Sequence, residues 1–165
     1  DLYGISRGYS NLGSIAEDDN QWDEALSYYF KADSLFEETK DFAAQASNLL
    51  AIGRVYDEQN RINDAIKYSL KALEKARQVK ALSFVANASQ QLASLEEKRH
   101  NYTIALGYQK MYNQFADSLN NENHRANLEE LKTKFDFDEK QREIALLKKD
   151  KELEQALVER KNIIT

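Results

Sequence analysis

The chain has 165 residues, a length that fits one ordinary domain with a buried core and does not favour a second independent globular unit. It contains no proline and five glycines, which predicts an almost entirely helical protein, and no cysteine, which excludes disulfides and thiolate metal sites. The net charge of −5 leaves no basic surface for a phosphate backbone, so nucleic acid is not expected as a direct partner.

The first forty residues are predicted to form two helices, near residues 2–17 and 22–39. The polar segment EDDNQ separates them, as expected of a cluster that ends one helix and starts another. Two helices approach closely only where the side chains at their crossing are small. We therefore expect Gly13 and Ala25 to meet within this hairpin, and Ala32 to let the next hairpin stack against it.

The same pattern returns twice with a period of 40 residues. Further helices are predicted near residues 42–57 and 62–79, then near 82–97 and 102–118, with DEQNR and EKRHN as the polar breaks. The recurrent positions expected to pack the repeats are Leu12, Gly13, Ala25, Ala32, Ile52, Gly53, Tyr56, Ala65, Ala72, Leu92, Ala93 and Ala105.

These columns resemble the tetratricopeptide repeat, whose signature combines a large residue, Leu-Gly, Tyr, Ala, an aromatic residue and Ala. The third copy matches less well, because Glu96 and Tyr112 replace the expected Tyr and Ala. The period of 40 in place of 34 and the missing proline resemble the long-period form of the family. The resemblance implies an all-α, right-handed α-solenoid of three helical hairpins over residues 1–40, 41–80 and 81–118.

Residues 119–165 follow a different pattern, because no polar break occurs near 137–141, where the repeat would require one. One long amphipathic helix is predicted, from about residue 121 to about residue 160. Its apolar positions, with one stutter, indicate a coiled-coil linker that pairs with a second copy, in parallel, as a homodimer. The predicted seam contains Leu128, Leu131, Phe135, Leu146, Leu153 and Leu157.

No catalytic residue, cofactor or metal site is expected. The two histidines, His100 and His124, are 24 residues apart and have no ligand-like spacing, so solvent-facing positions explain them. The acidic cluster between Glu17 and Glu24 lacks the spacing of a calcium loop. We expect it to cap the second helix instead, because acidic groups are favoured at the positive end of a helix.

The family resemblance implies a concave groove lined by the first helix of each hairpin, where a protein or peptide binds. An empty, solvated face is the alternative. The peptide-carboxylate clamp known in the family is absent, because its columns hold Ser10, Ser14, Ala51, Asn87 and Gln91. The predicted groove residues are Arg7, Ser10, Ser14, Glu17, Ser47, Leu50, Arg54, Asp57, Asn87, Gln90, Ser94 and Lys98.

Repeats followed by a charged helix are similar in architecture to the sensor portion of membrane-bound bacterial signalling proteins, such as histidine kinases and tethered transcription regulators. That resemblance implies a position at the periplasmic face of a bacterial membrane, with the membrane segment outside this chain. The chain opens at Asp1 without methionine and reads as a piece of a longer protein. The alternative is a free cytoplasmic adaptor that oligomerises through the C-terminal helix.

Overall fold

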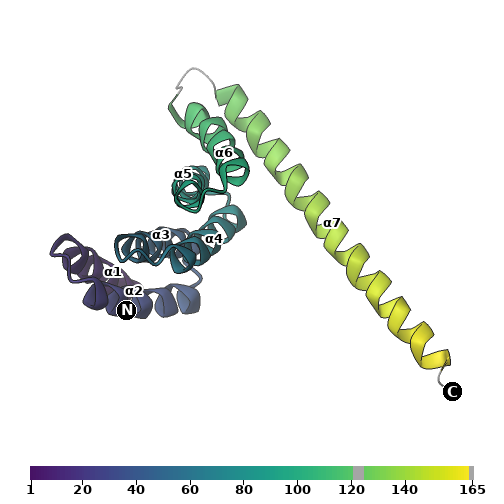
Figure 1. Ribbon diagram of the computed structural model, residues 1–165, viewed down its shortest axis with the longest axis horizontal. Coiled ribbons are helices and arrows are strands. Elements are labelled where there is room, and N and C mark those ends of the chain that lie inside the picture. The colour runs from purple at the N-terminus through teal and green to yellow at the C-terminus, as the bar shows by residue number, and fades with distance from the viewer. Residues whose placement is uncertain (121–124, 164–165) are drawn as a thin grey trace. The chain divides into compact units, whose positions relative to one another are not determined.

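The computed structural model contains seven helices in the residues it describes, which are 1–120 and 125–163, with side chains described for 1–117, 132–134 and 136–156 (Figure 1). The chain divides into two units, Asp1–Asn121 and Glu122–Thr165. The helices are α1 Leu2–Asp18, α2 Trp22–Thr39, α3 Phe42–Glu58, α4 Ile62–Gln78, α5 Leu82–Lys98, α6 Tyr102–Asn120 and α7 Arg125–Ile163.

Each of the first five helices is followed by a residue in the left-handed backbone conformation, at intervals of twenty residues. At the turn after α1, the amide of Asn20 donates to the carbonyl of Glu17 at 2.9 Å, and the amide of Gln21 donates to that of Ala16 at 2.8 Å. This pair of bonds is a Schellman cap, and it recurs at all five turns. The residues with positive φ are Asn20, Lys40, Asn60, Lys80 and His100.

Consecutive helices pair as hairpins, α1 with α2, α3 with α4 and α5 with α6. The hairpins stack through α2 on α3 and α4 on α5, and the first helices also touch one another, α1 with α3 and α3 with α5. The expected all-α solenoid of helical hairpins, followed by a long C-terminal helix, is therefore confirmed. The six helices of the repeats begin and end within two residues of the predicted bounds.

Small residues lie where the two helices of a hairpin cross. A Cβ atom added at Gly13 would lie 2.6 Å from the ring of Tyr29, so this ring is its nearest neighbour across the first hairpin, and the expected contact of Gly13 with Ala25 stays a prediction. A Cβ atom at Gly53 would lie 2.8 Å from the Oγ of Ser69 and 3.2 Å from the carbonyl oxygen of Ala65. The glycines therefore allow α1 and α3 to approach their partner helices closely.

The first hairpin differs from the others on its outer face. Leu12 is 44% exposed, whereas Ile52 and Leu92, its equivalents in the next two repeats, are fully buried. The helix before each of them explains the difference, because α2 packs on α3 and α4 packs on α5. The repeat positions are therefore not buried alike, although the sequence pattern treats them as equivalent.

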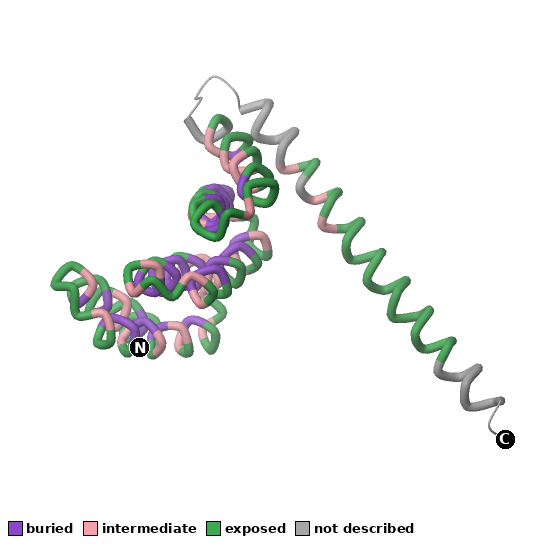
Figure 2. Tube along the Cα trace, viewed as in Figure 1, coloured by how far each residue is buried: buried purple, intermediate pink, exposed green. Residues whose placement is uncertain are grey.

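Helix α7 has 39 residues and continues through 137–141 without a break. At 1.5 Å per residue it is about 58 Å long. Its described apolar side chains are exposed, including Leu146 and Leu153 of the predicted seam at 63% each. Figure 2 colours most of the described part of α7 as exposed. Phe137 and Ile144 lie on the opposite side of the helix, because nine residues at about 100° each amount to half a turn beyond two full turns.

The remaining seam positions, Leu128, Leu131, Phe135 and Leu157, lie outside the residues whose side chains are described. Pairing of α7 with a second copy therefore stays a prediction. No helix in the described part of the chain has the length and apolar character that crossing a membrane requires.

Candidate binding groove

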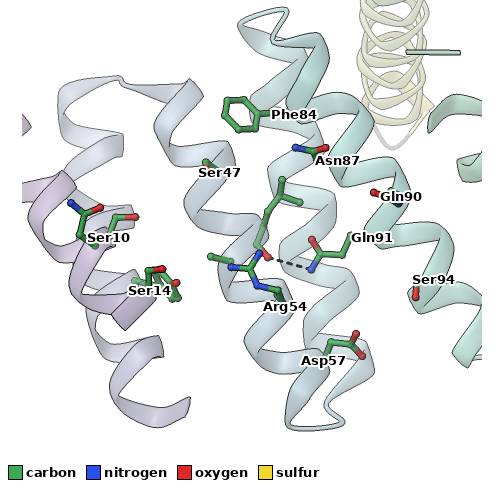
Figure 3. A pocket seen from close by; sticks show the side chains of 14 residues that line it. Ser10, Ser14, Ser47, Arg54, Asp57, Phe84, Asn87, Gln90, Gln91 and Ser94 are labelled. Atoms are coloured by element: carbon green, nitrogen blue, oxygen red, sulfur yellow. Dashed lines mark hydrogen bonds between the residues drawn. The ribbon is translucent and has the colours of Figure 1, made fainter. Parts of the chain in front are cut away.

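The first helices of the three hairpins together form a groove that contains a cavity of about 700 Å³. Figure 3 shows side chains of α1, α3 and α5 around this cavity, with Ser10 and Ser14 on α1, Ser47 on α3 and Asn87 on α5. Stacking of the hairpins creates the groove, because it places helices that are forty residues apart in the sequence side by side.

Most of the predicted groove residues line this cavity or its neighbour. A second cavity of about 430 Å³ is lined by Arg7, among others, and shares Ser10, Asn11, Ser47 and Phe84 with the larger one. Glu17 and Lys98 do not line either cavity, but each pairs with a residue that does. The predicted residues that line the larger cavity are Ser10, Ser14, Ser47, Leu50, Arg54, Asp57, Asn87, Gln90 and Ser94.

Five lining residues of the larger cavity are absent from the predicted set. Phe84 lies three residues before Asn87, on the same face of α5, so helical spacing alone could have found it. Its equivalents are Gly4 and Ala44, and the repeat pattern therefore gave no signal of an aromatic ring there. The five residues are Asn11, Tyr29, Ala51, Phe84 and Gln91.

A partly exposed hydrogen-bond network joins the first two hairpins beside the groove. The Oη of Tyr29 donates to the Oε2 of Glu17 at 2.6 Å, and the Nη2 of Arg54 donates to the same oxygen at 3.0 Å. Burial, followed by the bond to Glu17, raises the pKa of the Tyr29 hydroxyl, so Tyr29 remains a donor. The carboxylate of Glu17 raises the pKa of Arg54. Arg54 therefore remains charged and bound to Glu17.

A second set of contacts joins α3 to α5 in the same way. The Nζ of Lys98 lies 2.5 Å from the Oδ1 of Asp57. The Nε2 of Gln91 donates to the carbonyl oxygen of Leu50 at 3.2 Å, the bond drawn as a dashed line in Figure 3. These contacts bridge α3 and α5 along the groove.

The two histidines and the acidic cluster were also considered from the sequence as possible metal ligands. The Nδ1 of His100 lies 3.0 Å from the Oη of Tyr102, and His124 lies outside the described residues. Of the acidic cluster, Asp23 and Glu24 do lie in the first turn of α2. Among the described residues, no three His, Cys, Asp or Glu side chains are grouped as metal ligands.

The sequence of the first two hairpins also matches a known repeat family. Residues 4–78 match the family model for the tetratricopeptide repeat, which is 75 of the 165 residues and covers the first two hairpins. A comparison with curated proteins gives no significant match. Tetratricopeptide repeats are generally non-catalytic modules that bind proteins or peptides. The family match and the stacked hairpins together support a tetratricopeptide-repeat domain in the N-terminal part of the chain.

Proposed function

We propose that the chain is a non-catalytic interaction module whose concave groove binds a protein or peptide segment. One observation carries this proposal: exposed, neutral polar side chains from three successive first helices converge on one cavity of about 700 Å³. A solvated face with no binding role remains the alternative reading, and it predicts that changes in the groove affect no interaction.

A selection experiment tests this proposal. Random twelve-residue peptides displayed on phage are selected on immobilised residues 1–165, and the binding of the enriched peptides is measured. We expect binding to fall at least tenfold in the double variant Asn87→Ala/Gln90→Ala, because both exposed side chains line the groove. Asn63→Ala, at an exposed asparagine on α4, is the matched control and should leave binding unchanged.

Enriched peptides that bind equally well to the double variant would place the interaction elsewhere on the protein. Circular dichroism melts of all variants check folding. Exposed helical positions accept alanine without loss of stability, because alanine has the highest helix propensity.

We also propose that this chain is the sensory region of a membrane-anchored bacterial signalling protein, at the periplasmic face of the membrane. In that protein, α7 passes a binding event to an output domain. A free cytoplasmic adaptor is the second candidate. The exposed apolar side chains of α7 favour both, since each requires this helix to pair with another copy. The chain encoded after Thr165 distinguishes them: about 20 apolar residues there would support the sensor, and a polar continuation would support the adaptor.

Pairing of α7 can be measured by light scattering on residues 1–165 over a range of concentrations. We expect a dimer that becomes a monomer in Leu146→Lys/Leu153→Lys, because lysines on the predicted seam oppose pairing. The matched control carries Lys148→Leu, which leaves the seam unchanged and should not reduce the mass. A monomeric mass for the unchanged protein at all concentrations would contradict the pairing of α7.

A further inference from the structure

The charged side chains of the larger cavity already have partners within the protein. Its lining contains two of them, Arg54 and Asp57, which pair with Glu17 and Lys98 respectively. A charged ligand would compete with these ion pairs and would gain little net attraction, because each charge is already neutralised by its partner. The centre of the groove therefore favours a ligand with no charge of its own.

Four neutral polar side chains of the cavity, in contrast, are exposed to solvent. Ser47, Asn87, Gln90 and Ser94 are exposed and line its walls (Figure 3). A side-chain amide offers both donors and acceptors, and a peptide main chain presents one donor and one acceptor per residue. These side chains therefore match an extended main chain, whatever its sequence.

The length of the groove sets the length of the bound segment. Packed helices lie about 8 to 10 Å apart, so three successive first helices span about 20 Å. An extended chain covers about 3.3 Å per residue. A segment of about six residues therefore reaches from α1 to α5.

One apolar site interrupts this polar lining. The ring of Phe84 is half-buried and lines both cavities. In the smaller cavity, the walls beside it include Ala43, Ala44 and Tyr3. Its two charged side chains have partners within the protein, because the Arg7 guanidinium lies 5.2 Å from the centre of the Tyr3 ring and the Asp41 carboxylate accepts from the amide of Ala44. The smaller cavity has a volume of about 430 Å³, which is enough for a large apolar side chain of a ligand to lie against the Phe84 ring.

We propose that the groove binds an extended, uncharged peptide segment of about six residues through its main chain, with one large apolar side chain seated against Phe84. This proposal rests on the proposed function of the groove and specifies the class of its ligand. Two properties follow from it. Affinity depends on the apolar residue more than on the rest of the sequence, and it changes little with salt, because no ion pair forms on binding.

Ten-residue peptides of Ser, Thr, Asn and Gly with one central Phe test the proposal by fluorescence anisotropy on residues 1–165. Companion peptides carry Ala, Asp or Lys at the centre. We expect the Phe peptide to bind at least about tenfold more tightly than the Ala peptide, as burial of a Phe side chain predicts. We expect its Kd to change less than about twofold between 50 and 500 mM NaCl.

Protein variants then locate the two parts of the interaction. Phe84→Ala should remove the preference for Phe, whereas Phe137→Ala, at an exposed phenylalanine on α7, should not. Asn87→Ala/Gln90→Ala should weaken the Phe and Ala peptides by a similar factor, because it removes contacts to the main chain. Asn63→Ala should affect neither peptide.

Two results overturn the proposal in distinguishable ways. Tighter binding of the Asp or Lys peptide, with strong salt dependence and no effect of Phe84→Ala, would show that the groove selects charge, and the groove would keep its proposed function. If none of these peptides and no library-selected peptide binds in a manner sensitive to Asn87→Ala/Gln90→Ala, the proposed function fails as well.

Discussion

Helices α1 and α3 occupy equivalent positions in two repeats, yet they are buried very differently. Leu12 and Ile15 of α1 are 44% and 58% exposed, whereas Ile52 and Val55 of α3 are fully buried. Helix α2 packs on α3, and among the described residues no helix precedes α1 to pack on it in the same way. In a stack of hairpins, the neighbouring hairpin therefore decides whether a residue is buried. Residues at equivalent repeat positions contribute differently to stability as a result.

The same comparison shows what does not depend on the neighbour. The turn after α1 and the turn after α3 have the same Schellman bonds and an asparagine in the same backbone conformation, with φ of 59° and 56°. Local structure is therefore repeated faithfully from hairpin to hairpin, while packing is not. The predictions that follow separate these two contributions.

The largest difference in stability is expected between the variants Ile52→Ala and Leu12→Ala. Truncation of the buried Ile52 should lower the free energy of unfolding by about 2 to 5 kcal/mol, because it removes apolar contacts and leaves a cavity. Truncation of Leu12, which is partly solvated already, should cost less than about 1 kcal/mol. Urea denaturation of the two variants measures both. Equal losses would mean that the outer face of α1 is covered in solution.

Gly13→Ala and Gly8→Ala are expected to change the free energy of unfolding in opposite directions. The new methyl group at position 13 would lie 2.6 Å from the buried ring of Tyr29, so overpacking should destabilise the protein by about 1 to 3 kcal/mol. No atom lies within 4 Å of the corresponding point at Gly8. Gly8→Ala should therefore stabilise the protein by up to about 1 kcal/mol, through helix propensity alone. Thermal denaturation should give melting temperatures on opposite sides of the unchanged protein, and two shifts of the same sign would contradict the assignment of Gly13 to a helix crossing.

Equal effects are expected at the two turns. Asn20→Ala and Asn60→Ala should each cost about 1 kcal/mol, because alanine tolerates the left-handed conformation less well than asparagine does. Ser27→Ala, at an exposed position inside α2, is a control that should not destabilise the protein. A large difference between the two asparagine variants in urea denaturation would show that the turns, too, depend on neighbouring hairpins.

The smallest effects are expected at the ion pairs along the groove. Arg54→Gln and Lys98→Gln should each cost less than about 1 kcal/mol, because both basic side chains are roughly half exposed. Denaturation in 50 mM and 1 M NaCl should show that salt reduces the cost of each change. A cost of several kcal/mol at either position would mean that the pair is shielded from solvent.

The helices were predictable from the sequence because their signals are local. Asn20, Asn60 and His100 lie in the polar segments that separate the predicted helices of each hairpin. The structure places a turn at each of these residues. The exposure of Leu12 was not predictable, because it depends on which helix precedes the hairpin. Phe137 and Ile144 of α7 were missed, because the predicted seam followed only the apolar positions on the opposite side of the helix.

The candidate groove was predictable in part. Helical spacing along the first helices identified Ser47, Asn87 and Gln90 as neighbours of the same cavity. The ion pair of Glu17 with Arg54 was not predicted, because its residues are 37 positions apart and belong to different columns of the repeat. Long side chains reach one helical turn beyond their column, and the repeat pattern does not record that reach.

The central claim is that the concave face formed by α1, α3 and α5 binds a peptide segment. Amide chemical shifts of ¹⁵N-labelled residues 1–165, followed during titration with a peptide selected by phage display, test it most directly. We predict saturable changes at Ser47, Asn87 and Gln90, and none at Asn63 on α4. Saturable changes confined to α2, α4 or α7, with the groove residues unaffected, would contradict it.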